Sequence, residues 1–228
     1  MAVTDRYRKP DDLPSLIPVF PLQGCILLPR SGLPLNIFEP RYLHMVSDAL
    51  AKDRVIGIVQ PGSGPVEEGE SPEGKSCALR HTGAAGRITA YNETDDGRVL
   101  ITLTGIARFD IVREQETALP YRMCHVSYEA YAKDFIRGHG QEEVDWQRLL
   151  RILRTYLDAR KLSADWASIE RSPAELLVNT LSMISPYGPE EKQALLEAPE
   201  LKDRAEVLMT LAQMELARPE DGSGSSLQ

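Results

Sequence analysis

Residues 17–60 read IPVFPLQGCILLPRSGLPLNIFEPRYLHMVSDALAKDRVIGIVQ, and this stretch decides the fold of the N-terminal half. It holds the short apolar runs IPVF, CILL and LPLNIF, each interrupted or closed by proline. Because proline removes a backbone donor from a strand, these runs predict bent or edge strands. Glu39-Pro40 then predicts the start of a helix, since proline is favoured at the first helical position. Residues 55–60 form the next apolar run and predict another strand.

The strand pattern resumes after a Gly/Pro/Glu-rich segment at residues 61–76. Residues 87–91 and 98–104 flank the turn signal Asp96-Gly97, which predicts a hairpin. Two further strands are predicted at 106–113 and 121–131. About six strands with one inserted helix are typical of a small β-barrel.

The C-terminal half changes to a helical pattern. Leu149, Leu153 and Leu157 recur at the spacing of one helix face, and Ser172-Pro173-Ala174-Glu175 has the sequence of a capping box. We expect about four helices here, the last of them burying Leu201, Ala205, Leu208 and Ala212. The expected division is a flexible N-terminus at 1–15, a β-barrel domain at 16–131, a junction at 132–143, a helical bundle at 144–217 and a flexible tail at 218–228.

Composition limits the classes of partner. The 228 residues carry a formal net charge of −8, which argues against nucleic acid or an anionic membrane as the main partner. The sequence holds no run of about 18 apolar residues and no secretory signal, so we expect a cytoplasmic protein without a membrane span. Its three cysteines are widely spaced, which indicates free thiols in a reducing compartment.

Three segments together resemble the N-terminal, substrate-binding domain of Lon proteases. They are LPLNIFEPRY at 33–42, TGAAGRI at 82–88 and LTGIARF at 103–109. The resemblance implies an α+β chain of bacterial type, with a PUA-like β-barrel followed by a C-terminal α-helical bundle. In that family the domain grips protein substrates, and the ATPase and peptidase domains follow it. We expect neither of those domains within these 228 residues.

The first of these segments supplies the candidate binding residues Asn36, Phe38, Glu39, Arg41 and Tyr42, as contacts for a polypeptide. A structural interpretation competes with this one. Glu39 would cap the helix, Arg41 would pair with a nearby carboxylate, and Asn36 would satisfy backbone groups at a bend. On that interpretation we expect Phe38 and Tyr42 in the hydrophobic core.

Residues 69–76 read GESPEGKS and match the phosphate-binding pattern G-x-x-x-x-G-K-[ST]. A P-loop needs a strand directly before it and a helix directly after it. Here the preceding strand ends near Gln60, a Gly-rich β region follows, and the neighbouring glutamates would repel a triphosphate. We therefore interpret the segment as a solvated acidic loop.

The sequence shows no motif for catalysis or for a metal. HExxH, clustered Cys/His and G-x-S-x-G are all missing, and the four histidines do not pair at ligand spacing. We therefore expect no catalytic residues, no metal and no cofactor.

The leading hypothesis is a non-catalytic module that binds unfolded or partner polypeptides in protein quality control, at the barrel face or in a groove between barrel and bundle. Self-association is left open. The first alternative is a nucleotide-dependent enzyme or a peptidase, acting through residues 69–76 or a cryptic site. The second is an RNA-binding PUA-like module, which the charge opposes.

Overall fold

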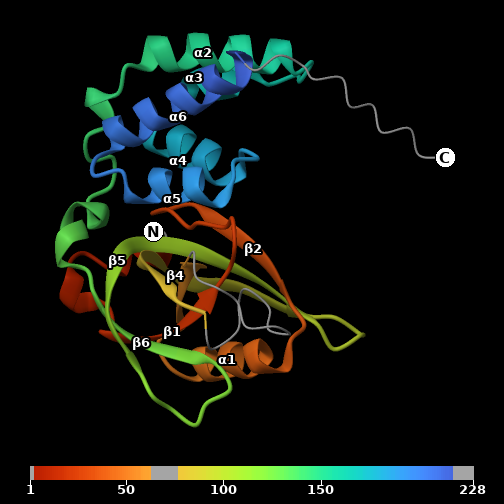
Figure 1. The fold of residues 1–228 in the computed structure, drawn as a ribbon, viewed down its shortest axis with the longest axis vertical. Coiled ribbons are helices and arrows are strands. Elements are labelled where there is room, and N and C mark those ends of the chain that lie inside the picture. Colours follow the sequence, from red (N-terminus) through yellow and green to blue (C-terminus); the bar gives the residue numbers. More distant parts are fainter. Residues whose placement is uncertain (1–2, 63–76, 218–228) are drawn as a thin grey trace.

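The computed structural model describes residues 3–62 and 77–217. The chain is α+β: a six-stranded sheet with one helix comes first, and a group of helices follows (Figure 1). The strands are β1 (Leu16–Pro21), β2 (Gly32–Ile37), β3 (Val55–Pro61), β4 (Leu79–Glu93), β5 (Val99–Gln115) and β6 (Arg122–Ser127). The α-helices are α1 (Pro40–Ala51), α2 (Trp146–Ala159), α3 (Trp166–Arg171), α4 (Ala174–Ile184), α5 (Pro189–Glu197) and α6 (Leu201–Ala217). The short 3₁₀ helices are η1 (Val3–Arg6), η2 (Pro10–Asp12), η3 (Glu129–Phe135) and η4 (Gln141–Glu143).

The strands follow the order β2-β5-β4-β3-β1-β6, and β6 pairs with β5 as well as with β1. Pairing therefore runs in a closed circuit through five strands, and β5 is the only described strand that pairs with β2. The β1–β3 pair is parallel and the other pairs are antiparallel. The prediction of an α+β chain with about six strands is confirmed.

Two details of the strand prediction are wrong. The run CILL is not a strand, although Ile26, Leu27 and Leu28 are buried. The expected strands at 98–104 and 106–113 form one long strand, β5, because Gly105 continues it instead of ending it. The amide of Gly105 donates to the carbonyl oxygen of Ser31 at 2.9 Å, and its own carbonyl accepts from the Arg30 amide at 2.8 Å.

The region around residues 121–131 also differs from the prediction. Only Arg122–Ser127 is extended, and the 3₁₀ helix η3 follows it. This helix brings Asp134 into the interior, where its carboxylate meets Arg108 of β5. Asp134, which lies in the expected polar junction at 132–143, is therefore a buried structural residue.

The N-terminal segment packs on the sheet over its described part. Tyr7 and Leu13 are buried in an apolar cluster with strand residues, whereas we expected residues 1–15 to be loose. The Arg87 guanidinium donates to the Tyr7 hydroxyl at 3.0 Å, and the Tyr128 hydroxyl donates to the Pro14 carbonyl oxygen at 3.0 Å.

Residues 144–217 contain five α-helices where about four helices were expected, the additional one being the short α3. The expected core positions of the last helix, Leu201, Ala205, Leu208 and Ala212, are all buried. The expected capping box does not form, since the Ser172 hydroxyl donates to the Ser168 carbonyl oxygen instead. Glu175 accepts from Arg30 and from the Gly138 amide, so it joins the helices to the rest of the chain.

A shared core holds the two halves together. One apolar cluster contains residues of the sheet, of α1 and of α2, α4, α5 and α6. In Figure 1, α5 lies next to the strands, while α2 lies at the far end of the helical half and α1 at the opposite end of the molecule. None of the helices in the described ranges has the length and hydropathy needed to span a membrane.

Candidate functional site

Beside the shared apolar core, one part of the junction between sheet and helices is filled by polar groups. Arg108 is 4% exposed; it donates to Asp134 at 2.8 Å and to the Ala198 carbonyl oxygen at 2.6 Å. A second ion pair, Arg30 with Glu175, lies beside it. Only a cavity of about 30 Å³ remains there, which is too small for a peptide. The groove expected between the two halves is therefore absent at this place.

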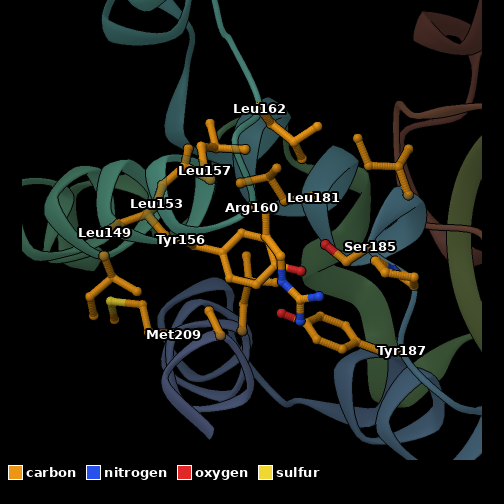
Figure 2. Close-up of a pocket in the computed structure, with 15 residues that line it drawn as sticks. Leu149, Leu153, Tyr156, Leu157, Arg160, Leu162, Leu181, Ser185, Tyr187 and Met209 are labelled. Atoms are coloured by element: carbon orange, nitrogen blue, oxygen red, sulfur yellow. The ribbon is translucent and has the colours of Figure 1, made fainter. Parts of the chain in front are cut away.

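A larger groove lies within the helical half, between α2, α4 and α6 (Figure 2). Its volume is about 450 Å³, which falls in the range of about 300–1,000 Å³ usual for ligand sites. Aliphatic side chains form most of its wall, and Leu153 of α2, Leu181 of α4 and Met209 of α6 represent the three helices. We call this site the helical groove.

The helical groove exists because α2 has a wide apolar stripe. Leu149 and Leu153 are buried against the neighbouring helices, as their spacing predicts. Ile152, Tyr156 and Leu157 extend the stripe and are only half-buried, and they line the groove. Leu157 shares a helix face with Leu149 and Leu153 by its spacing, and the apolar residues at 152 and 156 are the sequence signal that the stripe is wider than one packed face.

Polar atoms are concentrated in one part of the helical groove. The Tyr156 hydroxyl donates to Glu215 Oε2 at 2.8 Å, and Arg160 Nη2 donates to the same oxygen at 2.9 Å. Tyr187 lies near Tyr156 and Arg160 (Figure 2) and interacts electrostatically with both. Burial, with the nearby Tyr156 and Glu215, raises the pKa of Tyr187 to about 12, so this hydroxyl stays protonated at neutral pH. These groups could fix the direction of a bound chain.

The rim of the helical groove continues the apolar surface. Leu162, just after α2, is 56% exposed, and Ile184, at the end of α4, is 70% exposed; both line the groove. Large exposed apolar side chains at the edge of an apolar groove are characteristic of interaction sites.

The five candidate residues from the sequence lie elsewhere, where β2 joins α1. Asn36 is exposed in β2, and Glu39 forms an ion pair with Arg41 at 2.8 Å. Tyr42 is 3% exposed and packs on Phe20, with the ring centroids 4.1 Å apart, so its expected place in the core is confirmed. Phe38 is 64% exposed, so its expected place in the core is wrong.

A second, smaller cavity lies close to this junction. It has a volume of about 350 Å³ and is formed by α1 and by the hairpin between β4 and β5. Val99 lines it and pairs with Ile37, the residue directly before Phe38. We call Asn36, Phe38, Glu39 and Arg41 the β2–α1 surface, which lies at the other end of the molecule from the helical groove (Figure 1).

Two of the three cysteines, Cys25 and Cys124, are shielded from water in a way that suppresses their reactivity. Burial raises the pKa of both Cys25 and Cys124 to about 11, so each remains a thiol and a poor nucleophile at neutral pH. Within residues 3–62 and 77–217, no group of three or more His, Cys, Asp or Glu side chains could hold a metal. The P-loop-like sequence at 69–76 lies outside the described residues.

Comparison with known families gives one match that covers most of the chain. Residues 16–213 match the model for the ATP-dependent protease La (LON) substrate-binding domain. A Lon protease of Syntrophus aciditrophicus is 26% identical over 223 residues, which cover 92% of this chain and 26% of that protein. The chain spans about a quarter of the length of the curated relatives it matches over most of its length.

Solved structures show the same fold. A Lon N-terminal domain protein from Xanthomonas campestris superposes with a TM-score of 0.57 at 20% identity, covering 90% of this chain and all of that one. The N-terminal domain of a Mycobacterium avium complex Lon protease gives a TM-score of 0.59 at 16% identity, covering 87% of this chain and 98% of the other.

Proposed function

The chain belongs to the family of LON substrate-binding domains, and from that premise we propose that it is a non-catalytic module that binds polypeptides. It would capture exposed segments of unfolded or partner proteins as part of protein quality control in the cytoplasm. The observation that carries this proposal is the helical groove, because it is large, open and apolar.

The groove suits reversible capture of a flexible chain. Burying one Leu, Ile or Phe side chain is worth roughly 1.5–3 kcal/mol, and a volume of about 450 Å³ accommodates only a few such side chains. Association and chain ordering cost several kcal/mol of this gain. The remaining affinity is modest, as capture and release of many different sequences requires.

The β2–α1 surface is a second proposed contact for a polypeptide. Its exposed aromatic ring, Phe38, lies next to the Glu39–Arg41 ion pair, which offers both signs of charge to a bound chain. Among the strands of residues 3–62 and 77–217, β2 pairs on one side only, so its other edge could accept an extended peptide. Pro34 limits this addition, because proline has no backbone N–H to donate.

For the architecture, we propose a PUA-like β-barrel at residues 16–131, a junction at 132–143 and a helical bundle at 144–217. The pairing of β6 with both β1 and β5 supports closure of the barrel. The residues that line the helical groove all fall within 144–217, and those of the β2–α1 surface all fall within 16–131, which is consistent with this division.

Two other functions have less support. A nucleotide-dependent activity would depend on residues 69–76, whose neighbouring sequence is rich in glutamate. RNA binding would need a basic surface, and the net charge of −8 opposes it.

Fluorescence anisotropy with a labelled, permanently unfolded protein tests the proposal, with the native form of that protein as a control and ATP added in a parallel series. We expect saturable binding of the unfolded form alone, with or without ATP. Ile184→Glu should weaken this binding about tenfold, which corresponds to about 1.4 kcal/mol, because it places a charge at the apolar rim.

Val112→Glu is the matched control, since Val112 is 65% exposed on β5 and does not line the helical groove. Failure of the unfolded protein to bind would overturn the proposed function. Equal loss of binding in Ile184→Glu and Val112→Glu would overturn the assignment to the groove.

A further inference from the structure

The small cavity between the two halves has an excess of positive charge. Its volume is about 30 Å³, and its wall contains four basic side chains besides a histidine, but three carboxylates. Three of the cations are each bonded to one carboxylate: Arg108 to Asp134, Arg30 to Glu175 and Lys133 to Glu200. The fourth cation, Arg204 of α6, is bonded to no carboxylate in the described part of the chain.

Arg204 is also short of hydrogen-bond acceptors. Its Nε donates to the Leu195 carbonyl oxygen at 2.8 Å and its Nη1 donates to Asn179 Oδ1 at 3.0 Å, and both acceptors are neutral. Its Nη2 is buried and has no acceptor among residues 3–62 and 77–217. The residue is only 4% exposed, so bulk water does not solvate this charge.

A buried charge that no bonded carboxylate balances is unfavourable. Removing an ion from water costs several kcal/mol unless a charge of opposite sign accompanies it. Burial and the nearby positive charge of Arg108 both lower the pKa of Arg204. The carboxylates of Asp134 and Glu175 offset only part of this pKa shift. Leu201, the first residue of α6, is also at the wall, and the N-terminus of this 17-residue helix adds partial positive charge.

We propose that this cavity binds one small monovalent anion, of the halide class, which accepts a hydrogen bond from Nη2 of Arg204. One water-sized occupant needs roughly 10–15 Å³ of such space, so the volume admits a single small ion. A water molecule would satisfy the hydrogen bond of Nη2, but only an anion also balances the fourth cation.

The position of the site gives the anion a structural role. Arg204 and Asn179 belong to α6 and α4, whereas Arg108 belongs to β5 and Asp134 to η3. An anion bound among them connects the helical half to the sheet half, and its loss weakens the junction that sets their relative orientation.

Crystals of the whole chain grown or soaked in sodium bromide provide the direct test, because bromide scatters anomalously and water does not. We expect an anomalous peak in the cavity within hydrogen-bonding distance of Arg204 Nη2. A cavity that shows ordinary water density and no anomalous signal would overturn the proposal.

Thermal unfolding adds a measurement in solution. At equal ionic strength, raising bromide from about 10 to 300 mM should increase the Tm by a few degrees, whereas gluconate, which is too large for the cavity, should not. Arg204→Met should abolish the difference between the two salts, and Arg154→Met, at an exposed ion pair, should preserve it. If Arg204→Met does not fold, the anomalous map decides; equal Tm values in the two salts for the unmodified chain would contradict the proposed role.

Discussion

Asp134→Asn should destabilise the protein strongly, because Asp134 is the charge partner of the buried Arg108. Its carboxylate accepts from Nε, Nη2 and the backbone amide of Arg108, at 2.9, 2.8 and 2.9 Å. The side chains of Arg108 and Asp134 are 4% and 9% exposed. Breaking a buried pair by removing one partner costs about 3–5 kcal/mol, a large part of the 5–15 kcal/mol typical of a whole domain.

Urea unfolding followed by circular dichroism at pH 7 measures this cost by linear extrapolation. Glu170→Gln is the control, because its pair with Arg154 is exposed on both sides and should cost at most about 1 kcal/mol. If Asp134→Asn also costs less than about 1 kcal/mol, the junction does not depend on this pair, and the interpretation of η3 as a structural element fails.

Two further predictions concern a buried amine and the β2–α1 surface. Burial lowers the pKa of Lys192 to about 8; the folded chain therefore releases this proton before the unfolded chain does, and stability should rise with pH above about 8. The test compares two proteins that both carry Cys25→Ser, one with Lys192 and one with Lys192→Met, by urea unfolding at pH 7 and pH 9. Between these pH values the free energy of unfolding should rise by about 1 kcal/mol more in the protein that keeps Lys192, and an equal change in both proteins would refute this prediction. Phe38→Ala should change the free energy of unfolding by less than about 0.5 kcal/mol and weaken polypeptide binding about fivefold. Tyr42→Ala, in the core, should instead lower the free energy of unfolding by about 3–5 kcal/mol. If folded Phe38→Ala binds the unfolded protein as tightly as the unmodified chain in the anisotropy assay, the β2–α1 contact is ruled out.

The strands and helices with strong periodicity could be predicted from the sequence. The Asp96-Gly97 turn predicted the β4–β5 hairpin, and Glu39-Pro40 predicted the start of α1. Gly105 shows where such prediction ends. Its place between two apolar runs predicts a break between strands. In the structure a Cβ at this position would lie 2.1 Å from the Leu28 carbonyl oxygen, so glycine is needed for the close approach of residues 28–31. That contact is between distant parts of the chain and leaves no local pattern.

The candidate site was predicted less well than the fold. The motif at 33–42 placed Tyr42 in the core correctly but also placed Phe38 there, because an aromatic residue between strand and helix gives no sign of its direction. The helical groove depends on how far α2 stands from α4 and α6, and helix spacing is not encoded in the periodicity of any one helix. Likewise, nothing near Arg204 in the sequence indicates a buried cation without a carboxylate.

Mapping the bound polypeptide on the protein by NMR tests the central claim most directly. Isotopically labelled chain would be titrated with an unlabelled, permanently unfolded protein, and methyl and amide shifts would be followed. We predict that the shifts concentrate on residues of the helical groove such as Leu157, Leu181 and Ile184, at a concentration matching the anisotropy titration. Saturable binding that leaves these signals unmoved, with shifts confined to other surfaces, would contradict the groove as the site of capture.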